Sequence, residues 1–483
     1  MWHPIAISAT ILLVCVFVFP LTSQAQSSRP FNLFNLRNLS VAYLTSSARA
    51  LAMGGVAIAA TGEPTTISAN PAGLAQFQFP AASLGHRFRN VNHSEPGASC
   101  EQGNITIENE DFVNDQTMVN VIIPTRFVKV AVFREVVVDK RFSIVAPQIL
   151  QFSSIDQQPA EVLQQNFPAR QTQLKFDVID NAFAMAFRLS NSLHFGAAFR
   201  LTGFEYHLSE QEYFASDHTL NTNQDCLQNR LQAENLYLIR SVDESEWRPG
   251  ISAGLLYKIN KQLTSGFTYL IRPQFDLDIN IIAPAYSVRG QDNNPSVAFP
   301  AFIESEKIAC DLPDVIGFGL SYRDFKRLTT GVDLQYIRYS KIAHALSDNK
   351  SNGERNLIQD DNTLTNADPD GAPDMVISDG WQFSAGVEYG ITPKSKKLPF
   401  LSYNIQSLHV RAGYLRQPSG VMYANEVNSQ LRHAFPKEKA VDFFTLGLGT
   451  VLGVQSSRVR VDIAFSYSSE IIETMVSGAI FIF

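Results

Sequence analysis

The sequence has few charged residues, and after residue 30 it has no apolar run of the about 18 residues that a membrane-spanning helix needs. Charged residues make up 18% of the chain, below the roughly 25% of soluble domains. The formal net charge is −7, so no basic surface for nucleic acid is expected. This composition argues against a helical membrane bundle and against nucleic acid as a partner.

The sequence also lacks the motifs of common enzymes. It contains no Gly-x-Ser-x-Gly, no metal-spaced pair of histidines and no CxxC. We therefore expect no enzymatic activity. Beyond the first 25 residues the cysteines are Cys100, Cys226 and Cys310. An odd number leaves at least one thiol unpaired or paired between chains, so one disulfide and three free thiols both remain open.

The first 25 residues are expected to be a secretory signal peptide. Residues 5–19 form an apolar run that is too short to span a membrane, and Pro20 ends it. Ser23-Gln24-Ala25 then offers a small-x-small cleavage site. One departure is His3, which stands where Lys or Arg is usual. We expect residues 1–25 to be removed on export.

What the chain does contain is a repeated alternation of apolar and polar residues. In residues 458–467 the odd positions are Val, Val, Ile, Phe and Tyr, and the even positions are Arg, Arg, Asp, Ala and Ser. Successive side chains of a strand point to opposite faces, so this strand has one apolar face. Similar alternation occurs in residues 193–204, 251–257, 263–271, 316–322, 328–339 and 408–414.

The connections between these segments come in two lengths. Short polar turns lie at residues 190–192, 260–262, 323–327 and 455–457, and long connections at 91–115, 140–170, 210–230, 284–309, 341–379 and 417–440. Short turns at one rim and long loops at the other are typical of outer-membrane barrels. We predict an all-β fold, in which residues 78–483 form a transmembrane antiparallel β-barrel of about 14 strands.

Residues 45–75 differ from the rest of the chain. They are apolar and rich in small residues, including Gly54, Gly55, Gly62 and Gly73. Small residues permit close packing against surrounding walls. We predict that residues 26–77 form an N-terminal plug inside the barrel. Glycines on the polar faces of the strands would leave room for it, as at Gly254, Gly266, Gly317, Gly319, Gly447 and Gly449.

The same stretch resembles the N-terminal signature of the FadL/TodX family. The similar residues are the run from Ala48 to Gly55 (ARALAMGG), the turn Gly62-Glu63-Pro64 and then Asn70-Pro71-Ala72-Gly73. Members of this family are outer-membrane barrels that take up long-chain fatty acids and aromatic hydrocarbons. The family often has two acids in the turn, whereas this chain has one.

The C-terminus carries a second resemblance. Phe483 ends an alternating strand, which resembles the signal that the barrel-insertion machinery recognises. Together the resemblances imply a protein of the bacterial outer membrane, in contact with its lipid, that transports hydrophobic small molecules. The N-terminal signature is shared with PorV-type barrels, so a role in protein secretion or surface attachment is the alternative.

The resemblance also implies a mechanism. In the family the Asn-Pro-Ala element blocks the lumen, and ligand leaves sideways through an opening in the wall. Carried over, Asn70, Pro71, Ala72 and Gly73 would form the gate. The alternative is an ordinary turn inside a static plug.

Two further sets of residues are candidates for binding. The inward-facing Arg188, Arg200, Arg411 and Arg460 could meet a fatty-acid carboxylate, because guanidinium binds carboxylates with two donors. Alternatively they form ion pairs with Asp333, Glu388 or Asp462.

A calcium site is the second candidate. Asn366, Asp368, Asp370 and Asp374 alternate around a glycine within residues 341–379, as oxygen ligands do in calcium loops. The pattern resembles thrombospondin type 3 repeats but is no complete EF-hand, because Ile377 stands where Glu is required. An ordinary exposed loop is the alternative. No other cofactor is expected.

Overall fold

The computed structural model describes residues 45–60, 62–100, 103–146, 149–152, 164–167, 169–213, 236–284, 286–288, 297–299, 301–324, 327–342, 375–392, 404–421, 423–424, 437–454 and 457–483. The predicted signal peptide and the predicted plug before residue 45 lie outside these residues, so their boundaries stay predictions. None of the helices in these ranges is long and apolar enough to cross a membrane.

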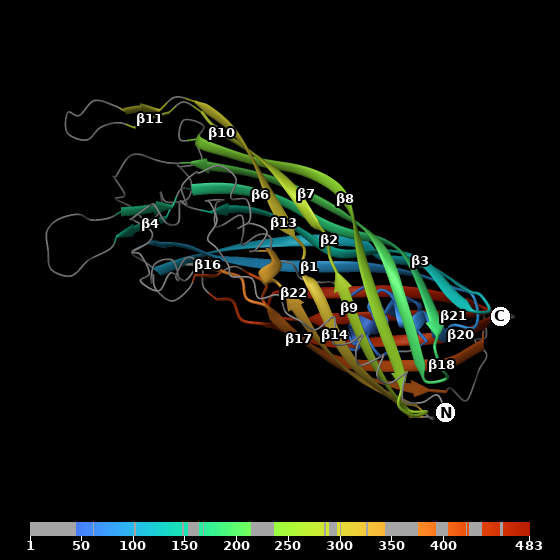
Figure 1. Cartoon of the computed structure of the whole chain (residues 1–483). Helices are drawn as coiled ribbons and strands as arrows, with labels where there is room; N and C mark the ends of the chain where they lie inside the picture. Colours follow the sequence, from blue (N-terminus) through green and yellow to red (C-terminus); the bar gives the residue numbers. More distant parts are fainter. Residues whose placement is uncertain are drawn as a thin grey trace, which may run out of the picture.

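Fourteen of the sixteen strands in the main sheet close into an antiparallel barrel (Figure 1). In spatial order they are β1 (Ala81–Cys100), β2 (Gly103–Pro124), β3 (Val128–Ala146), β6 (Ala169–Arg188), β7 (Leu193–Tyr213), β8 (Leu236–Lys258), β9 (Leu263–Ile271), β14 (Asp314–Arg323), β15 (Leu328–Arg338), β17 (Gly380–Ile391), β18 (Asn404–Gln417), β20 (Val441–Val454), β21 (Ser457–Tyr467) and β22 (Ile471–Ile482). The last strand pairs with the first, for example Phe481 with Ala81, which closes the ring. The predicted fold is confirmed.

The other two strands of the sheet extend the barrel wall at the end with the long connections. Pro273 separates β9 from β10 (Gln274–Ala283), and Pro313 lies between β13 (Phe302–Asp311) and β14. The upper part of β10 pairs with β8, at Ile279 and Val242 for instance, and its other edge pairs with β13. Proline cannot donate to a ladder, so strands break there.

Three short pairs lie outside the main sheet. They are β4 (Ile149–Phe152) with β5 (Gln164–Phe167), β11 (Tyr286–Val288) with β12 (Val297–Phe299), and β16 (Met375–Val376) with β19 (Tyr423–Ala424). We call the end that carries them the long-loop end and the opposite end the short-turn end. Both the chain's last strand and the hairpin turns after β2, β6 and β8 reach the short-turn end (Figure 1).

All six of the predicted long connections contain strand residues. Residues 91–100 and 103–115 continue β1 and β2, and residues 302–309 belong to β13. Residues 91–100 (VNHSEPGASC) are mostly polar or small on both faces, so this part of β1 lacks the alternation by which the rest was predicted. Conversely, β21 and β22 meet in a turn of only three residues at the long-loop end, Ser468 to Glu470.

Alternation along each strand separates an outer apolar face from an inner polar one. On β20, Phe444, Leu446 and Leu448 are 64%, 61% and 63% exposed, whereas the intervening Thr445 is 2% exposed. Aromatic pairs mark the outer rim of the apolar band: Tyr336 lies 5.0 Å from Trp381 and Tyr414 lies 5.7 Å from Phe444, between ring centroids. An outward apolar band bounded by aromatics is how a barrel meets a bilayer.

Residues 45–77, which we call the lumen segment, pack against the inner faces of strands all around the barrel (Figure 1, blue). They contain α3 (Ala48–Ala52) and the 3₁₀ helices η1 (Pro64–Ile67) and η2 (Pro71–Gln76). Ser47 caps α3, because its hydroxyl accepts a hydrogen bond from the Ala50 N–H at 3.0 Å. The polar lumen face of the wall therefore encloses a compact, largely buried segment.

Wall glycines make this close approach possible. A Cβ atom at Gly386 or Gly413 would overlap backbone atoms of Met53, and one at Gly196 would overlap backbone atoms of Pro71. Backbone can approach this closely only where the neighbouring residue has no side chain. The predicted inward glycines Gly254, Gly266, Gly317, Gly319 and Gly447 likewise face residues of the lumen segment. Gly449 instead leaves space for Asp462 and Arg411.

Candidate functional site

The inward face of β7 passes through four layers of the lumen. From the short-turn end to the long-loop end its buried inward residues are His194, Ala198, Arg200, Thr202, Phe204, Tyr206, Leu208, Glu210 and Glu212. His194 and the small residue Ala198 come first, on the part of the strand next to η2, and then a charged and polar layer. An apolar layer follows, and two glutamates end the series. The same strand thus contacts the lumen segment, a polar site and an apolar site.

The apolar layer is the largest buried hydrophobic cluster in the described part of the chain, and we call it the apolar cluster. Its members include Val137, Phe142, Phe176, Phe204, Tyr206, Leu208, Val242, Phe275, Leu277, Ile279, Cys310, Val315, Ile337 and Tyr339. In an ordinary water-filled barrel this position is polar. Cys310 is a free, buried thiol here, while Cys226 lies outside the described residues.

Aromatic rings form the centre of the apolar cluster. The ring centroids of Phe204 and Phe275 are 4.7 Å apart and stacked, and Phe176 lies 5.3 Å from Phe204 and 5.6 Å from Tyr206. Such ring pairs contribute about 0.5–1.5 kcal/mol each beyond the area that they bury. They join β6, β7 and β10 along one side of the wall, above the lumen segment.

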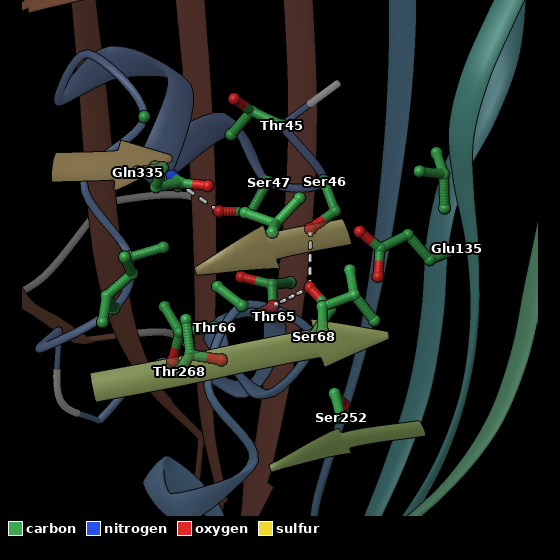
Figure 2. Close-up of a pocket in the computed structure, with 18 of the residues that line it drawn as sticks. Thr45, Ser46, Ser47, Thr65, Thr66, Ser68, Glu135, Ser252, Thr268 and Gln335 are labelled. Carbon is green, nitrogen blue, oxygen red and sulfur yellow. Dashed lines mark hydrogen bonds between the residues drawn. The ribbon is translucent and has the colours of Figure 1, made fainter. Parts of the chain in front are cut away.

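A cavity of about 120 Å³ lies between the apolar cluster and the lumen segment (Figure 2). Hydroxyl groups dominate its lining, with Val137, Leu270 and Val315 at its border with the apolar cluster. The hydroxyl residues are Thr45, Ser46, Ser47, Thr65, Thr66, Ser68, Ser252 and Thr268. The Ser46 and Ser68 hydroxyls are 3.2 Å apart, and the Glu135 carboxylate points toward them (Figure 2). We call this space the hydroxyl cavity.

Two arginines of the cavity wall share one buried carboxylate. Asp180 accepts from Arg200 Nη1 at 2.7 Å, and from Arg272 Nη1 at 2.8 Å on each oxygen. Thr202 donates a further hydrogen bond to Asp180 at 2.8 Å. Arg200 also donates to the Ser252 hydroxyl at 3.1 Å and to the carbonyl oxygen of Ser68. This network ties the wall to the lumen segment.

The wall beside this cavity is split. β2 pairs with β3 only from Met118 with Glu135 to Pro124 with Lys129. Above that point β2 pairs with β1 and β3 pairs with β6, without a described ladder between β2 and β3. We call the point where the β2–β3 ladder ends the fork. Register shifts lie next to it, at Thr117 on β2 and at Val137 on β3. They are bulges, which bend strands and end pairing. We call this gap the β2–β3 slit.

Side chains bridge the slit. Arg141 of β3 lies 3.2 Å from Asp115 of β2 and 3.3 Å from Asp139. Arg89 of β1 donates to the carbonyl oxygen of Asp139. Phe112 of β2 and Val132 of β3, on the outer wall above and below the fork, are 69% and 60% exposed. The outer surface beside the slit is therefore mixed, because Asn114, Gln116 and Arg134 are exposed there as well.

Ion pairs fix the lumen segment to the wall near the short-turn end. Arg49 of α3 donates to both oxygens of Glu388, at 2.9 and 3.0 Å. Glu63 lies 3.3 Å from Arg460. Burial alone would lower the pKa of Arg49, but the carboxylates of Glu388 and Glu63 outweigh it, so the pKa of Arg49 is raised above its ordinary value. Arg49 therefore stays charged.

A second attachment uses backbone donors. One oxygen of Asp333 on β15 accepts hydrogen bonds from the N–H groups of Ala57 and Ile58, at 2.6 and 2.9 Å. Asp333 was a predicted ion-pair partner for an inward arginine, but it accepts these hydrogen bonds from backbone N–H groups. It holds the middle of the lumen segment against the wall.

The predicted gate residues lie in the lumen against β7 and β8. Asn70 caps η2 by accepting from the Ala72 N–H at 3.0 Å, and it donates to the carbonyl oxygens of Ile58 at 2.9 Å and Leu255 at 3.2 Å. Pro71 occupies the first position of η2, where its missing N–H costs nothing. Ala72 and Gly73 are buried. Their gating role stays a prediction.

The four predicted arginine candidates occupy two levels. Arg200 lines the hydroxyl cavity, whereas Arg411 and Arg460 lie with Arg49 around Glu388, at 2.7 and 3.3 Å from its Oε2. Arg411 and Arg460 also each lie 2.8 Å from Asp462. Arg188 donates to the carbonyl oxygen of Ala75 at 2.9 Å. Arg411 and Arg460 therefore form ion pairs with Glu388 and Asp462, as the alternative left open by the sequence has it, and Arg200 pairs with Asp180. Carboxylate binding by any of the four stays a prediction.

The predicted calcium residues Asn366, Asp368, Asp370 and Asp374 lie outside the described residues. Within the described ranges no group of three or more His, Cys, Asp or Glu side chains could hold a metal ion.

Sequence reasoning missed Asp180, Arg272 and Glu135. The signal in the sequence that could have found two of them is their inward position on a strand. Asp180 shares the inward face of β6 with Ala182, and Glu135 shares that of β3 with Phe133. That signal selects dozens of residues, and only the register between β3, β6 and β7 brings these side chains to one level.

The sequence matches a known protein family, and the fold is similar to that of solved structures. The family model described as outer membrane protein transport protein (OMPP1/FadL/TodX) matches residues 36–470. The structure is similar to that of a Pseudomonas aeruginosa FadL homologue, with a TM-score of 0.57, 10% identity, and coverage of 92% of this chain and 99% of that chain. It is also similar to the CymD monoaromatic hydrocarbon channel, with a TM-score of 0.50, 12% identity, and coverage of 92% and 99%. At such identities the likeness shows the fold alone. No curated protein sequence matches the chain.

Proposed function

Because the chain belongs to the OMPP1/FadL/TodX family of outer membrane transport proteins, we propose that it carries hydrophobic small molecules, such as long-chain fatty acids or hydrocarbons, passively across that membrane. The protein is a bacterial outer-membrane β-barrel and not an enzyme. Outer-membrane barrels place short turns in the periplasm and long loops outside. The lumen segment then lies toward the periplasm and the apolar cluster toward the cell exterior.

The apolar cluster is the observation that carries this proposal. A water-filled pore would present polar side chains to the lumen, whereas here three successive inward positions of β7 are Phe204, Tyr206 and Leu208. An apolar ligand gains about 0.8 kcal/mol for each methylene that it buries among such side chains. We propose that ligand enters from the outside, inserts into the apolar cluster and is held there by burial.

The exit that we propose is the β2–β3 slit. The lumen segment fills the barrel below the hydroxyl cavity, and ion pairs and hydrogen bonds attach it at Glu388 and Asp333. The slit, in contrast, is bridged by side chains and borders the cavity at Glu135 and Val137. Movement of the lumen segment around Asn70 and Pro71 would widen the cavity toward the slit, and ligand would escape sideways into lipid.

An uptake assay tests the proposal. Cells with and without the protein are supplied with labelled oleate and, separately, with labelled toluene at the same external concentration. The proposal predicts faster initial uptake of at least one of them when the protein is present. Equal uptake of both would contradict it.

A crosslink tests the exit separately. In a background without native cysteines, Asp115→Cys with Arg141→Cys places one thiol on each side of the slit, within the reach of a short bis-maleimide that contains a disulfide, because the long Arg141 side chain spans this gap to Asp115. We expect crosslinking with this reagent to block uptake and reduction to restore it. The matched control is Val121→Cys with Val132→Cys, two residues that already face each other in the β2–β3 ladder. Uptake that survives the slit crosslink would rule out this exit.

The PorV-type alternative makes a different prediction. If the barrel serves secretion or surface attachment, affinity purification from its native membrane should recover a large protein partner in stoichiometric amount. A transport channel should instead retain lipid or detergent in the lumen.

A further inference from the structure

We propose that the hydroxyl cavity is a head-group site that selects uncharged ligands with a hydroxyl group, such as aliphatic alcohols or phenols, over carboxylates. The inference rests on the proposed transport function and names the ligand class for it. The apolar body of the ligand would lie in the apolar cluster, and its hydroxyl group would reach the cavity at the cluster's lower border.

Two hydrogen-bond acceptors in the cavity have no donor among the described residues. Oε2 of Glu135 and Oε1 of Gln382 are buried and have no hydrogen-bond partner among the described residues. Both residues are 8% exposed and line the cavity. Nη1 of Arg200 lies 3.9 Å from Glu135 Oε2, beyond hydrogen-bond distance. A buried acceptor without a donor costs free energy. A ligand O–H that donates a hydrogen bond to this acceptor would remove that cost.

The charges around the cavity already balance. The cations are Arg200, Arg272 and Lys341, and the carboxylates are Glu135, Asp180 and Asp314, so three positive charges face three negative ones. Lys341 lies 3.0 Å from Asp314, and Asp180 holds both arginines. A ligand carboxylate would bring a fourth negative charge into a buried site where each of these three cations already has a carboxylate partner. Burying an unpaired charge is strongly unfavourable.

The hydroxyl lining suits a neutral polar head. Serine and threonine hydroxyls donate and accept as their rotors turn, so they can adapt to a ligand hydroxyl in either role. Figure 2 shows Ser46, Ser68 and Ser252 on the same side of the cavity as Glu135. Val137 and Leu270 border both the cavity and the apolar cluster, so one ligand can reach both.

The first test uses the wild-type protein in lipid nanodiscs. Equilibrium dialysis measures binding of labelled octane, 1-octanol and octanoate at neutral pH, with empty nanodiscs subtracted. The three ligands share the length of the apolar chain and differ at one end. We expect 1-octanol to bind about tenfold more tightly than octanoate, and more tightly than octane. Octanoate binding as tightly as 1-octanol would overturn the inference.

The second test changes the charge of the cavity. Glu135→Gln removes one of the three carboxylates and leaves a surplus positive charge beside Arg200. Octanoate should then gain about tenfold in affinity and the preference for 1-octanol should fall. The control is Glu246→Gln, a partly exposed residue of β8 that pairs with Arg248 and does not line the cavity. An unchanged ratio in Glu135→Gln would also overturn the inference.

The outcomes separate this inference from the transport function. If none of the three ligands binds above empty nanodiscs, the proposed transport of hydrophobic molecules fails together with it. If octane and octanoate bind and 1-octanol has no advantage, transport stands and the head-group site does not.

Discussion

At the scale of single residues, Asp180 holds the polar layer of the lumen together. Its carboxylate neutralises Arg200 and Arg272, and all three side chains are buried. In Asp180→Ala the two guanidinium groups would share Glu135, whose carboxylate lies 3.9 Å from Arg200. Removing one partner of a buried ion pair costs about 3–5 kcal/mol, because the other partner stays buried. We expect a loss of this size in the free energy of unfolding, measured by urea unfolding in lipid.

The control for that substitution is Asp243→Asn on β8. The Asp243 side chain is 85% exposed. Exposed pairs contribute little, so its unfolding free energy should change by less than about 0.5 kcal/mol. Equal effects of the two substitutions would show that the buried network does not support the fold.

Gly413 is a second residue at which a substitution should have a large effect, because it lies against the lumen segment. A Cβ atom there would overlap the backbone of Met53 and Gly54, so Gly413→Ala should displace the lumen segment. We expect faster labelling of an Ala57→Cys reporter in the variant, in a background without native cysteines. Gly478→Ala is the control, because a Cβ at Gly478 comes no closer than 3.9 Å to another residue. A labelling rate that matches the control would contradict the tight contact.

At the scale of elements, β2 and β3 differ from the other neighbours in the ring. Their ladder ends at Met118 and Glu135, although both strands continue beyond it. Amide groups of β3 above Glu135 that point toward β2 therefore lack a ladder partner there, while those that point toward β6 are paired. The unpaired amides should exchange with deuterium at least about tenfold faster, because unprotected amides need no local opening.

Residue-resolved hydrogen exchange in nanodiscs measures this difference within one strand. Amides of β3 from Lys129 to Glu135 serve as the internal reference, since they lie in the paired part. Uniform protection along β3 would mean that the slit is closed by backbone pairing.

At the scale of the whole molecule, the outer surface determines where the protein can exist. Large apolar side chains are exposed on the outer face of most ring strands, among them Phe444 on β20 and Phe199 on β7. Contiguous apolar surface of this kind associates in water. We expect the mature chain to aggregate when detergent is removed and to stay dispersed in nanodiscs, as measured by size-exclusion chromatography. A monomer in buffer alone would contradict the outward apolar band.

The sequence predicted the barrel well because alternation is a local property. The odd and even positions of residues 458–467 assign each side chain to lipid or lumen without knowledge of any other strand. It predicted poorly where both faces are polar, as in the outer part of β1, because no contrast marks the strand. The likeness of residues 48–73 to a family signature supplied the expected gate and cargo, which local patterning could not.

The sequence alone therefore determined the fold class, the inward side of the strands that alternate and the small residues of the segment in the lumen. The tertiary structure decided which inward residues meet: Asp180 and Arg272 are 92 positions apart along the chain and form one ion pair. The physical reason is that alternation tells which face a side chain takes, whereas its height in the lumen depends on strand register and tilt. Those are set by the closed ring, so the hydroxyl cavity, the apolar cluster and the β2–β3 slit exist only in three dimensions.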